Sequence, residues 1–516
     1  MTVRGIRWAA ALAAGSAVTL GISALPAASA DVVVRTGKGL VRGTADASTR
    51  VFQGIPYAAR PERWTLPRPA AAWTGVRDAS RPGPMCSQLD AEGKVDPRSS
   101  EDCLFLNVTT PAGRGAGRRP VIVWFHGGGW ASGNGADYEA RSLSRIGDAV
   151  VVTVNSRLGI FGFFGYPGLT DGGTFGLADQ QASLRWVRAN ARAFGGDPAN
   201  VTIMGESSGG ASVCAQLVSP RSAGLFQRAV IESGSCLQHW APNVMVPDND
   251  AIEYWAPRSE LARNGRTTGT ELGCADLACL RGTPDVEGLL NHNALFGTPA
   301  YGTPILPVDP RRALKAGLVH RVPVLQGNTR DEHRYFARFF EDDAPMTAAE
   351  YRANLVKSFG RAMAAQIEKR YPVRAYPSPL IAWATVTTDS SWVCPTAEAS
   401  RLLARRTPVY SFSFDDPHAA VLEGTFPAGY PAGAYHGSEV AYLFDFGPAA
   451  PMTATQRGLS GQMIRYWTNF ARSGDPNGPG LPRWPAFAGG PTTQSLAPGR
   501  IGQVDLAVAH KCSAWK

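Results

Sequence analysis

Residues 201–209 of the chain read VTIMGESSG, an apolar run that passes directly into a serine flanked by glycines. The β-branched and apolar residues of the run predict a buried strand, and the Gly-x-Ser-x-Gly pattern that follows is typical of a sharp turn from strand to helix. Gly205 and Gly209 fit this turn because a Cβ at either position would meet the neighbouring strand or helix. Such a turn presents the hydroxyl of Ser207 at the edge of a sheet, so Ser207 is the candidate nucleophile.

Similar short apolar runs recur along the chain and predict further strands of the same sheet. Between the second and third runs, residues 177–194 carry apolar side chains at helical spacing, and Gly195 and Gly196 end the predicted helix. Strands that alternate with helices predict a mostly parallel sheet covered on both faces, with the functional residues in loops beyond the carboxyl ends of its strands. The predicted strands are residues 121–125, 150–154, 201–204, 229–231, 322–325 and 409–414.

A second motif, HGGG at residues 126–129, follows the predicted strand that ends at Phe125. Three consecutive glycines let the backbone approach a substrate closely. Backbone N–H groups in such a loop stabilise the oxygen that becomes negatively charged when a carbonyl is attacked. The expected donors are the amides of Gly128, Gly129 and Ser208.

Two further residues complete a candidate catalytic triad, in which the acid and then the histidine follow the serine along the chain. Glu332 lies just beyond a predicted strand, where a loop would expose it to the site, and Asp331 is its nearest competitor. His436 lies later, in the glycine-flanked stretch GAYHGSE at residues 433–439. We expect His436 to take the proton of Ser207 and Glu332 to orient the imidazole ring.

Two other stretches, EDCLFLNV at residues 101–108 and FGGDP at residues 194–198, extend the pattern. Together with the serine and glycine motifs they resemble the type B carboxylesterase family, which includes cholinesterases, cholesterol esterases and several lipases. The resemblance extends over nearly the whole chain. It implies the α/β-hydrolase fold, a central, mostly parallel, twisted sheet covered by helices on both faces, with inserted helical cap segments.

The resemblance also implies a carboxylic-ester hydrolase that forms and hydrolyses an acyl-enzyme, with a small-molecule ester as substrate and neither a metal nor an organic cofactor. Glu206, next to the nucleophile, is expected to favour a cationic His436. The positions that the family assigns are the same ones that the motifs indicate. They are the triad Ser207, Glu332 and His436 and the oxyanion hole Gly128, Gly129 and Ser208.

Two departures from the family pattern stand out. Many members have alanine where this chain has Ser208, and because Ser208 is expected to act through its amide, its hydroxyl is interpreted as incidental. Residues 303–308, TPILPV, lack the usual Asp-Gly turn, which leaves the shape of that loop in doubt.

All eight cysteines follow Ala30, and an even number in an exported chain favours disulfides. The resemblance implies three bridges. Cys214 and Cys236 are additional, and a fourth bridge and a pair of buried free thiols both remain open. The implied pairs are Cys86 with Cys103, Cys274 with Cys279, and Cys394 with Cys512.

The first thirty residues have the layout of a secretory signal peptide, with Arg4 and Arg7, an apolar run and small residues up to Ala30. Cleavage after Ala30 would release residues 31–516 as a single secreted domain. No later stretch is apolar for long enough to predict stable membrane insertion. The net charge of +9 is scattered rather than clustered, which argues against nucleic acid as a partner. The sequence leaves the oligomeric state open.

Two other interpretations compete with the carboxylesterase. A lipase or sterol esterase would use the same triad and would need a long apolar acyl channel. A non-catalytic binding or adhesion module of the same fold would be favoured if a catalytic position were lost, but Ser207, His436 and the glycine loop are all in place.

Overall fold

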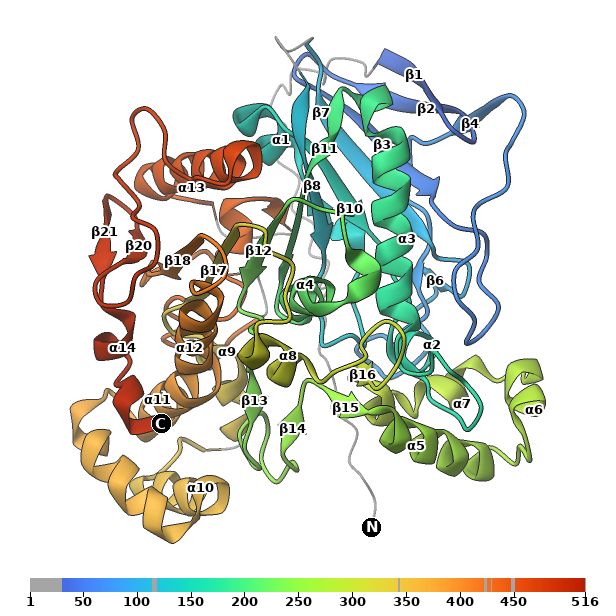
Figure 1. Cartoon of the computed structure of the whole chain (residues 1–516). Helices are drawn as coiled ribbons and strands as arrows, with labels where there is room; N and C mark the ends of the chain where they lie inside the picture. Colours follow the sequence, from blue (N-terminus) through green and yellow to red (C-terminus); the bar gives the residue numbers. More distant parts are fainter. Residues whose placement is uncertain are drawn as a thin grey trace, which may run out of the picture.

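A large sheet forms the centre of the computed structural model, which describes residues 30–113, 118–341, 344–421, 425–427, 429–446 and 451–515 (Figure 1). The predicted signal peptide lies outside these residues except for Ala30. Within them the sheet has 13 strands in the order β1-β2-β3-β7-β10-β8-β11-β12-β17-β18-β20-β21, with β4 paired to β2. The strands are β1 (Ala30–Thr36), β2 (Gly39–Ala45), β3 (Thr49–Pro56), β4 (Val76–Asp78), β7 (Phe105–Pro111), β8 (Arg119–Phe125), β10 (Val150–Val154), β11 (Gly196–Glu206), β12 (Arg228–Glu232), β17 (Val324–Thr329), β18 (Val409–Phe414), β20 (Thr493–Ala497) and β21 (Arg500–Val504).

The middle of this sheet is parallel, from β10 through β8, β11, β12, β17 and β18 to β20. Strands β1, β2, β3 and β7 form an antiparallel flank, and β21 closes the opposite edge. Every residue of β8, β10, β17 and β18 is buried, as expected for strands covered on both faces. The predicted mostly parallel sheet is therefore confirmed. Strand β17 begins at Val324, later than predicted, because Pro323 before it has no N–H to donate to a ladder.

Helices cover both faces of the sheet and divide the core in two. Along β8, Val121, Val123 and Phe125 join one cluster of buried side chains, whereas Ile122 and Trp124 join the other. Helices α3, α4 and α12 pack on the first face, and α1 and α13 pack on the second. These helices are α1 (Arg141–Gly147), α3 (Phe175–Asn190), α4 (Ser208–Val218), α12 (Cys394–Leu403) and α13 (Ala454–Ser473).

The predicted helix at residues 177–194 is α3, which a short 3-10 turn extends to Phe194. Gly195 then adopts φ 86°, a left-handed conformation that ends the helix. This stop leads directly into β11, the strand that carries the candidate nucleophile.

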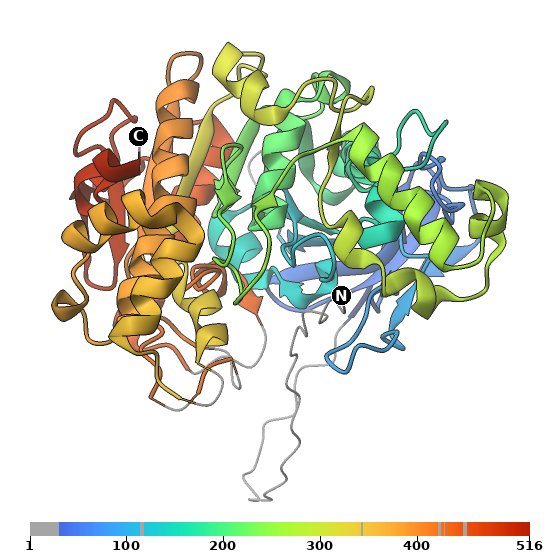
Figure 2. The ribbon, with the colours of Figure 1, turned by 90° about the horizontal axis from the view of Figure 1, so that it is seen from below.

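Additional helices gather at the end of the sheet where β11 passes into α4 (Figure 1). Seen from below, they spread across that end of the molecule, with α5 to α7 on one side and α10 and α11 on the other (Figure 2). They correspond to the predicted cap segments. Their bounds are α5 (Arg258–Glu271), α6 (Leu277–Gly282), α7 (Val286–Leu290), α10 (Ala348–Arg370) and α11 (Pro379–Thr387).

The loop at residues 303–308 forms a closed turn without the Asp-Gly pair. The N–H groups of Gly302 and Thr303 donate to the carbonyl of Leu306 at 2.8 and 3.2 Å. The hydroxyl of Thr303 in turn accepts the N–H of Leu306 at 3.0 Å. The side chain of Thr303 thus closes this turn, whose shape the absence of an Asp-Gly pair had left undetermined.

Candidate active site

Ser207 lies at the turn between β11, which ends at Glu206, and α4, which begins at Ser208. Its backbone has φ 57° and ψ −125°, a sparsely populated conformation for a residue with a side chain. A Cβ on Gly205 would come within 2.7 Å of the carbonyl oxygen of Phe125, and one on Gly209 would collide with that same oxygen. The glycines are therefore required by close packing, and the turn leaves Ser207 partly exposed.

His436 forms a buried pair with Glu332. The Nδ1 atom of the histidine lies 2.5 Å from Oε2 of the carboxylate, and the backbone N–H of His436 donates to the carbonyl of Glu332 at 3.3 Å. This contact fixes the proton of a neutral imidazole on Nδ1, so Nε2 is the nitrogen that can act as a base.

The carboxylate of Glu332 is fully buried and has donors on its second oxygen as well. Oε1 accepts hydrogen bonds from the hydroxyl of Ser233 at 2.5 Å, from the amide of Asn328 at 3.0 Å and from the N–H of Thr329 at 3.0 Å. Burial raises the pKa of Glu332, but His436 and these hydrogen bonds outweigh it and hold the pKa below its ordinary value. Glu332 is therefore ionised and fixed in place.

The competitor Asp331 makes different contacts. Its carboxylate pairs with Arg330 and Arg334 at 2.8 and 2.9 Å and accepts the N–H of Ala434 at 3.0 Å. Asp331 thus supports the loop that leads to His436 but does not contact the imidazole ring among the described residues.

The Nε2 atom of His436 lies 3.1 Å from Oε1 of Glu206. In the described part of the chain it makes no hydrogen bond to Ser207. Burial by itself lowers the pKa of His436, but Glu206 and Glu332 together outweigh it and raise the pKa above 6.5. A direct contact between the two side chains thus supports the expectation that Glu206 favours a cationic His436. Catalytic hydrogen bonds are often incomplete without substrate, so this geometry leaves His436 able to serve Ser207.

The glycine loop has the conformation that its sequence predicts. Gly128 and Gly129 have φ 104° and 63°, and among the described residues neither amide donates a hydrogen bond. Both glycines are at least partly accessible to solvent. Their N–H groups are therefore available to a substrate oxygen.

The hydroxyl of Ser208 is not incidental, contrary to the expectation from sequence. It accepts the backbone N–H of Trp130 at 3.2 Å, directly after the glycines of the loop. Trp130 itself has φ 56°, which side chains disfavour, and its indole N–H donates to Ser212 on α4 at 2.9 Å. Ser208 and Ser212 thus attach the glycine loop to the N-terminal part of α4.

Two buried carboxyl groups near Glu206 were not recognised in the sequence. Glu232 ends the neighbouring strand β12 and accepts the indole N–H of Trp467 at 2.5 Å, and burial raises its pKa to about 8. Burial likewise raises the pKa of Glu439 well above its ordinary value, and Glu206 adds to the shift. Burial therefore favours the neutral, protonated form of both carboxyl groups.

Trp392 is a further contact of the histidine that sequence reasoning missed. Its ring lies 4.5 Å from that of His436, centroid to centroid, and its indole N–H donates to Nδ1 of His333 at 3.2 Å. It belongs to a π-helix, Thr388–Val393, inserted between α11 and α12. Such insertions are frequent at functional sites, but no periodicity in the sequence predicts one.

The structure joins all eight cysteines. Cys214 on α4 bridges to Cys236 beyond β12, so the alternative of two free thiols is wrong. The three bridges implied by the resemblance are also present, Cys86–Cys103, Cys274–Cys279 and Cys394–Cys512.

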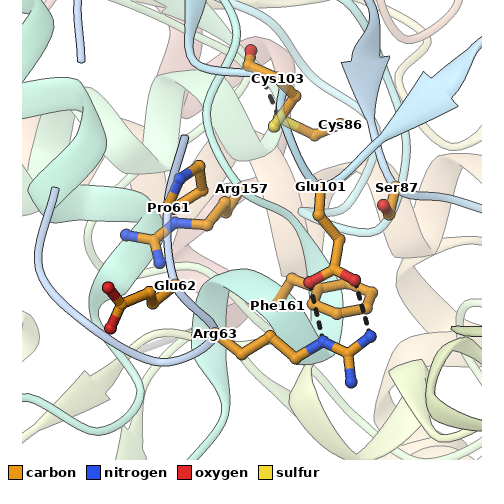
Figure 3. A pocket seen from close by; sticks show the side chains of 9 residues that line it. All are labelled: Pro61, Glu62, Arg63, Cys86, Ser87, Glu101, Cys103, Arg157 and Phe161. Carbon is orange, nitrogen blue, oxygen red and sulfur yellow. Dashed lines mark hydrogen bonds and ion pairs between the residues drawn. A yellow bond between two sulfur atoms is a disulfide. The ribbon is translucent and has the colours of Figure 1, made fainter. Parts of the chain in front are cut away.

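A small pocket lies beside the Cys86–Cys103 bridge, and no predicted catalytic residue lines it (Figure 3). In its wall, Arg63 forms two hydrogen bonds to Glu101 at 2.7 and 2.8 Å and lies over the ring of Phe161. Each charged side chain of this described wall has an ion-pair partner. The pairing holds the segment around Arg63 against the stretch at residues 101–108.

Comparison with known proteins gives one consistent result. A sequence model described as "Carboxylesterase family" matches residues 30–511. The chain is 32% identical to a cocaine esterase of Oryctolagus cuniculus over 494 residues, which covers 89% of the chain and 91% of that protein. It is also 32% identical to a para-nitrobenzyl esterase of Bacillus subtilis over 476 residues, covering 88% and 92%, respectively. A pyrethroid hydrolase, Ces2e, of Rattus norvegicus is 32% identical over 497 residues, covering 89% and 85%.

Proposed function

Because the chain belongs to the carboxylesterase family and is a carboxylic-ester hydrolase, we propose that Ser207, His436 and Glu332 are its catalytic triad. The observation that carries this proposal is the buried pair of His436 and Glu332, which lies beside a serine held in a strained turn. The contact of His436 with Glu206, the residue before Ser207, supports His436 as the base that serves this serine.

In the proposed mechanism, Oγ of Ser207 attacks the ester carbonyl carbon while its proton moves to Nε2 of His436. The carbonyl oxygen becomes negatively charged and accepts hydrogen bonds from the amides of Gly128, Gly129 and Ser208. Collapse of this intermediate breaks the bond to the alcohol, which leaves with the proton from His436. Water then attacks the acyl-enzyme with His436 again as base, which releases the carboxylic acid and restores Ser207.

Glu332 keeps its contact with Nδ1 throughout and stabilises the imidazolium that forms. Before attack, Nε2 has to exchange Glu206 for Ser207. Because Glu206 stays close after this exchange, it also stabilises the positive charge on His436.

We propose small-molecule carboxylic esters as the substrates. The names of the related proteins describe esters as different as cocaine, para-nitrobenzyl esters and pyrethroids. Their common chemistry is the ester bond, so the natural ester of this enzyme has to be found with a panel of acyl and alcohol groups.

We further propose that the enzyme is secreted as residues 31–516 after cleavage following Ala30. Disulfides persist in oxidising compartments, and four bridges are compatible with export. Among the helices of the described residues, none is long and apolar enough to cross a bilayer. Sequencing the N-terminus of the protein recovered from culture medium tests this proposal, and a start upstream of Asp31 would contradict it.

Replacing the nucleophile tests the mechanism. Ser207→Ala should lower kcat toward a para-nitrophenyl ester by about four orders of magnitude, because the acyl-enzyme cannot form. Thermal unfolding should show that the variant remains folded. An organophosphate should label the wild type on the peptide that contains Ser207 and leave the variant unlabelled. Labelling of a different serine, or retention of most of the activity, would refute the assignment.

A further inference from the structure

His333 follows the triad acid Glu332 directly and is a buried residue that the proposed mechanism does not use. It lies where the loop after β17 passes into the short helix α9 (Arg334–Ala337), and its side chain is fully buried. A buried imidazole needs hydrogen-bond partners for both ring nitrogens. His333 has both partners, and they lie 89 and 59 residues away along the chain.

These partners determine the tautomer of the ring. Nε2 lies 2.8 Å from the carbonyl oxygen of Val244, which can only accept, so this nitrogen carries the proton. Nδ1 accepts the indole N–H of Trp392 at 3.2 Å. Burial lowers the pKa of His333 to about 3, so the ring is neutral at neutral pH. The neutral form is required here, because a protonated Nδ1 could not accept from the indole.

The backbone of His333 adds a second attachment to the π-helix Thr388–Val393. The N–H of His333 donates to the hydroxyl of Thr388 at 2.9 Å, at the start of the π-helix. The imidazole holds Trp392 near the end of the same helix. The residue after the triad acid thus binds the π-helix at two points, and a displacement of the π-helix relative to Glu332 would strain both hydrogen bonds.

His333 also holds a second ring that contacts the catalytic base. Its carbonyl accepts the N–H of Phe336 at 3.1 Å within α9. The rings of Phe336 and Trp392 lie 5.5 Å apart, centroid to centroid, with an angle of 14° between their planes. Both contact the ring of His436, at centroid distances of 5.3 Å for Phe336 and 4.5 Å for Trp392. One residue therefore fixes two aromatic contacts of the catalytic imidazole.

These contacts matter because the imidazole of His436 has to turn during the reaction. In the structure Nε2 lies against Glu206, whereas Glu332 holds Nδ1. The proposed mechanism requires Nε2 to exchange Glu206 for Ser207 while the contact at Nδ1 stays in place. Rings packed against the imidazole limit the directions in which it can turn, because buried side chains are closely packed.

We propose that His333 is a positioning residue for the catalytic base: by fixing Trp392 and Phe336 against His436, it restricts the imidazole to orientations from which Nε2 can serve the nucleophile. This inference rests on the proposed triad. His333 acts through the two rings and not on the ester itself. Its loss should therefore slow the chemical step more than it weakens substrate binding, because a misplacement of about 1 Å can cost about a hundredfold in rate.

Two amide substitutions separate the two hydrogen bonds of the ring. Asparagine places its side-chain oxygen near the position of Nδ1 and can still accept from Trp392, whereas glutamine places its nitrogen near the position of Nε2 and can still donate to Val244. We expect His333→Gln to lower kcat for a para-nitrophenyl ester by about ten- to hundredfold with little change in KM. His333→Asn should keep kcat within about threefold of the wild-type value.

Two readouts distinguish positioning from a purely structural role. The first is kcat per site labelled by an organophosphate, since a structural role would reduce the number of labelled sites and leave the rate per site unchanged. The second is the pH dependence of kcat/KM. Its acid limb in His333→Gln should coincide with that of the wild type, because one neutral side chain replaces another.

Two further variants complete the experiment. Trp392→Phe keeps a ring but removes the indole N–H, so it should lower kcat per site in the same way, and it serves as the test if His333→Gln does not fold. His320→Gln is the matched control. Nε2 of His320 also donates to a backbone carbonyl, that of Ser219 at 2.8 Å, at the opposite end of α4 from Ser207. His320→Gln should therefore keep the wild-type kcat per site.

A wild-type kcat per site in His333→Gln would overturn the inference, as would the same result in Trp392→Phe where His333→Gln does not fold. Equal losses in His333→Asn and His333→Gln would also overturn it, because the bond to Trp392 would then not be the one that matters. A shifted acid limb in His333→Gln would mean that His333 acts through charge. These outcomes leave the triad intact, which fails separately if His436→Ala hydrolyses the ester as fast as the wild type.

Discussion

At the scale of single residues, Glu332 offers the cleanest test of the triad because glutamine has its shape. In Glu332→Gln the side-chain oxygen can still accept hydrogen bonds from Ser233, Asn328 and Thr329, so the fold should be retained. The amide lacks the negative charge that stabilises the imidazolium. We expect kcat to fall by about a thousandfold or more, measured with a para-nitrophenyl ester in the steady state.

Asp331→Asn is the matched control for this substitution. It weakens the ion pairs with Arg330 and Arg334 but leaves the Glu332–His436 contact in place. We expect a loss of less than about tenfold, through the loop that holds Ala434. If Asp331→Asn were the more damaging of the two changes, the acid of the triad would be wrongly assigned.

The pH dependence of the reaction should depend on Glu206. His436 accepts the proton of Ser207 only when neutral, so kcat/KM falls as the pH drops through the raised pKa of His436. Glu206→Gln removes one of the two carboxylates that raise this pKa. The pKa should therefore fall, and the acid limb of kcat/KM measured against pH should move to lower pH.

Glu439→Gln is the control for the pH experiment. Burial raises the pKa of Glu439 and favours its neutral form, so we expect the substitution to exchange one neutral group for another. Its acid limb should coincide with that of the wild type. A limb that stayed in place in Glu206→Gln would mean that Glu206 is itself protonated there, and the prediction would be wrong.

At the scale of structural elements, the attachment of the glycine loop to α4 can be tested at Ser208. In Ser208→Ala the N–H of Trp130 loses its acceptor, and a buried unpaired donor costs about 1 to 3 kcal/mol. The loop should relax to recover a partner, which displaces Gly128 and Gly129 from the oxyanion. We therefore expect lower kcat with little change in KM, together with a lower unfolding temperature.

Ser212→Ala distinguishes the loop backbone from the tryptophan side chain, because Ser212 accepts the indole N–H of Trp130 and, within the described residues, no backbone N–H of the loop. We expect it to affect kcat less than Ser208→Ala does. Equal effects on kcat would mean that the indole, and not the backbone attachment, positions the loop.

Elements formed by contiguous sequence could be predicted, and contacts between distant segments could not. The turn at Ser207 and the loop at residues 126–129 were recognisable because glycines within each stretch determine the local backbone. The contact of Ser208 with Trp130 spans 78 residues, so it depends on how two elements pack. Trp392 approaches His436 from a π-helix that has no local signature, which is why it was missed.

At the scale of the whole molecule, the bridges differ in how much chain they constrain. Cys394 and Cys512 are separated by 118 residues, and Cys274 and Cys279 by 5. The loop-entropy argument gives about 5 kcal/mol for the long loop and about 2 kcal/mol for the short one, as upper values. Replacing both cysteines of the long bridge by alanine should therefore lower the free energy of unfolding more than the same change in the short bridge.

Denaturant unfolding of the two double variants measures this difference. The order of the two losses is the prediction, because native-state effects alter the absolute values. A larger loss from the Cys274–Cys279 bridge would contradict the loop-entropy argument for this fold.

The strained backbone at Ser207 also has an evolutionary side. A residue held at φ 57° and ψ −125° costs the fold roughly 1 to 3 kcal/mol, and a glycine there would relieve most of it. Drift toward greater stability would thus favour losing the nucleophile, and the same scaffold could persist as a sturdier protein without activity. The serine lowers stability, so its retention depends on selection for catalytic activity.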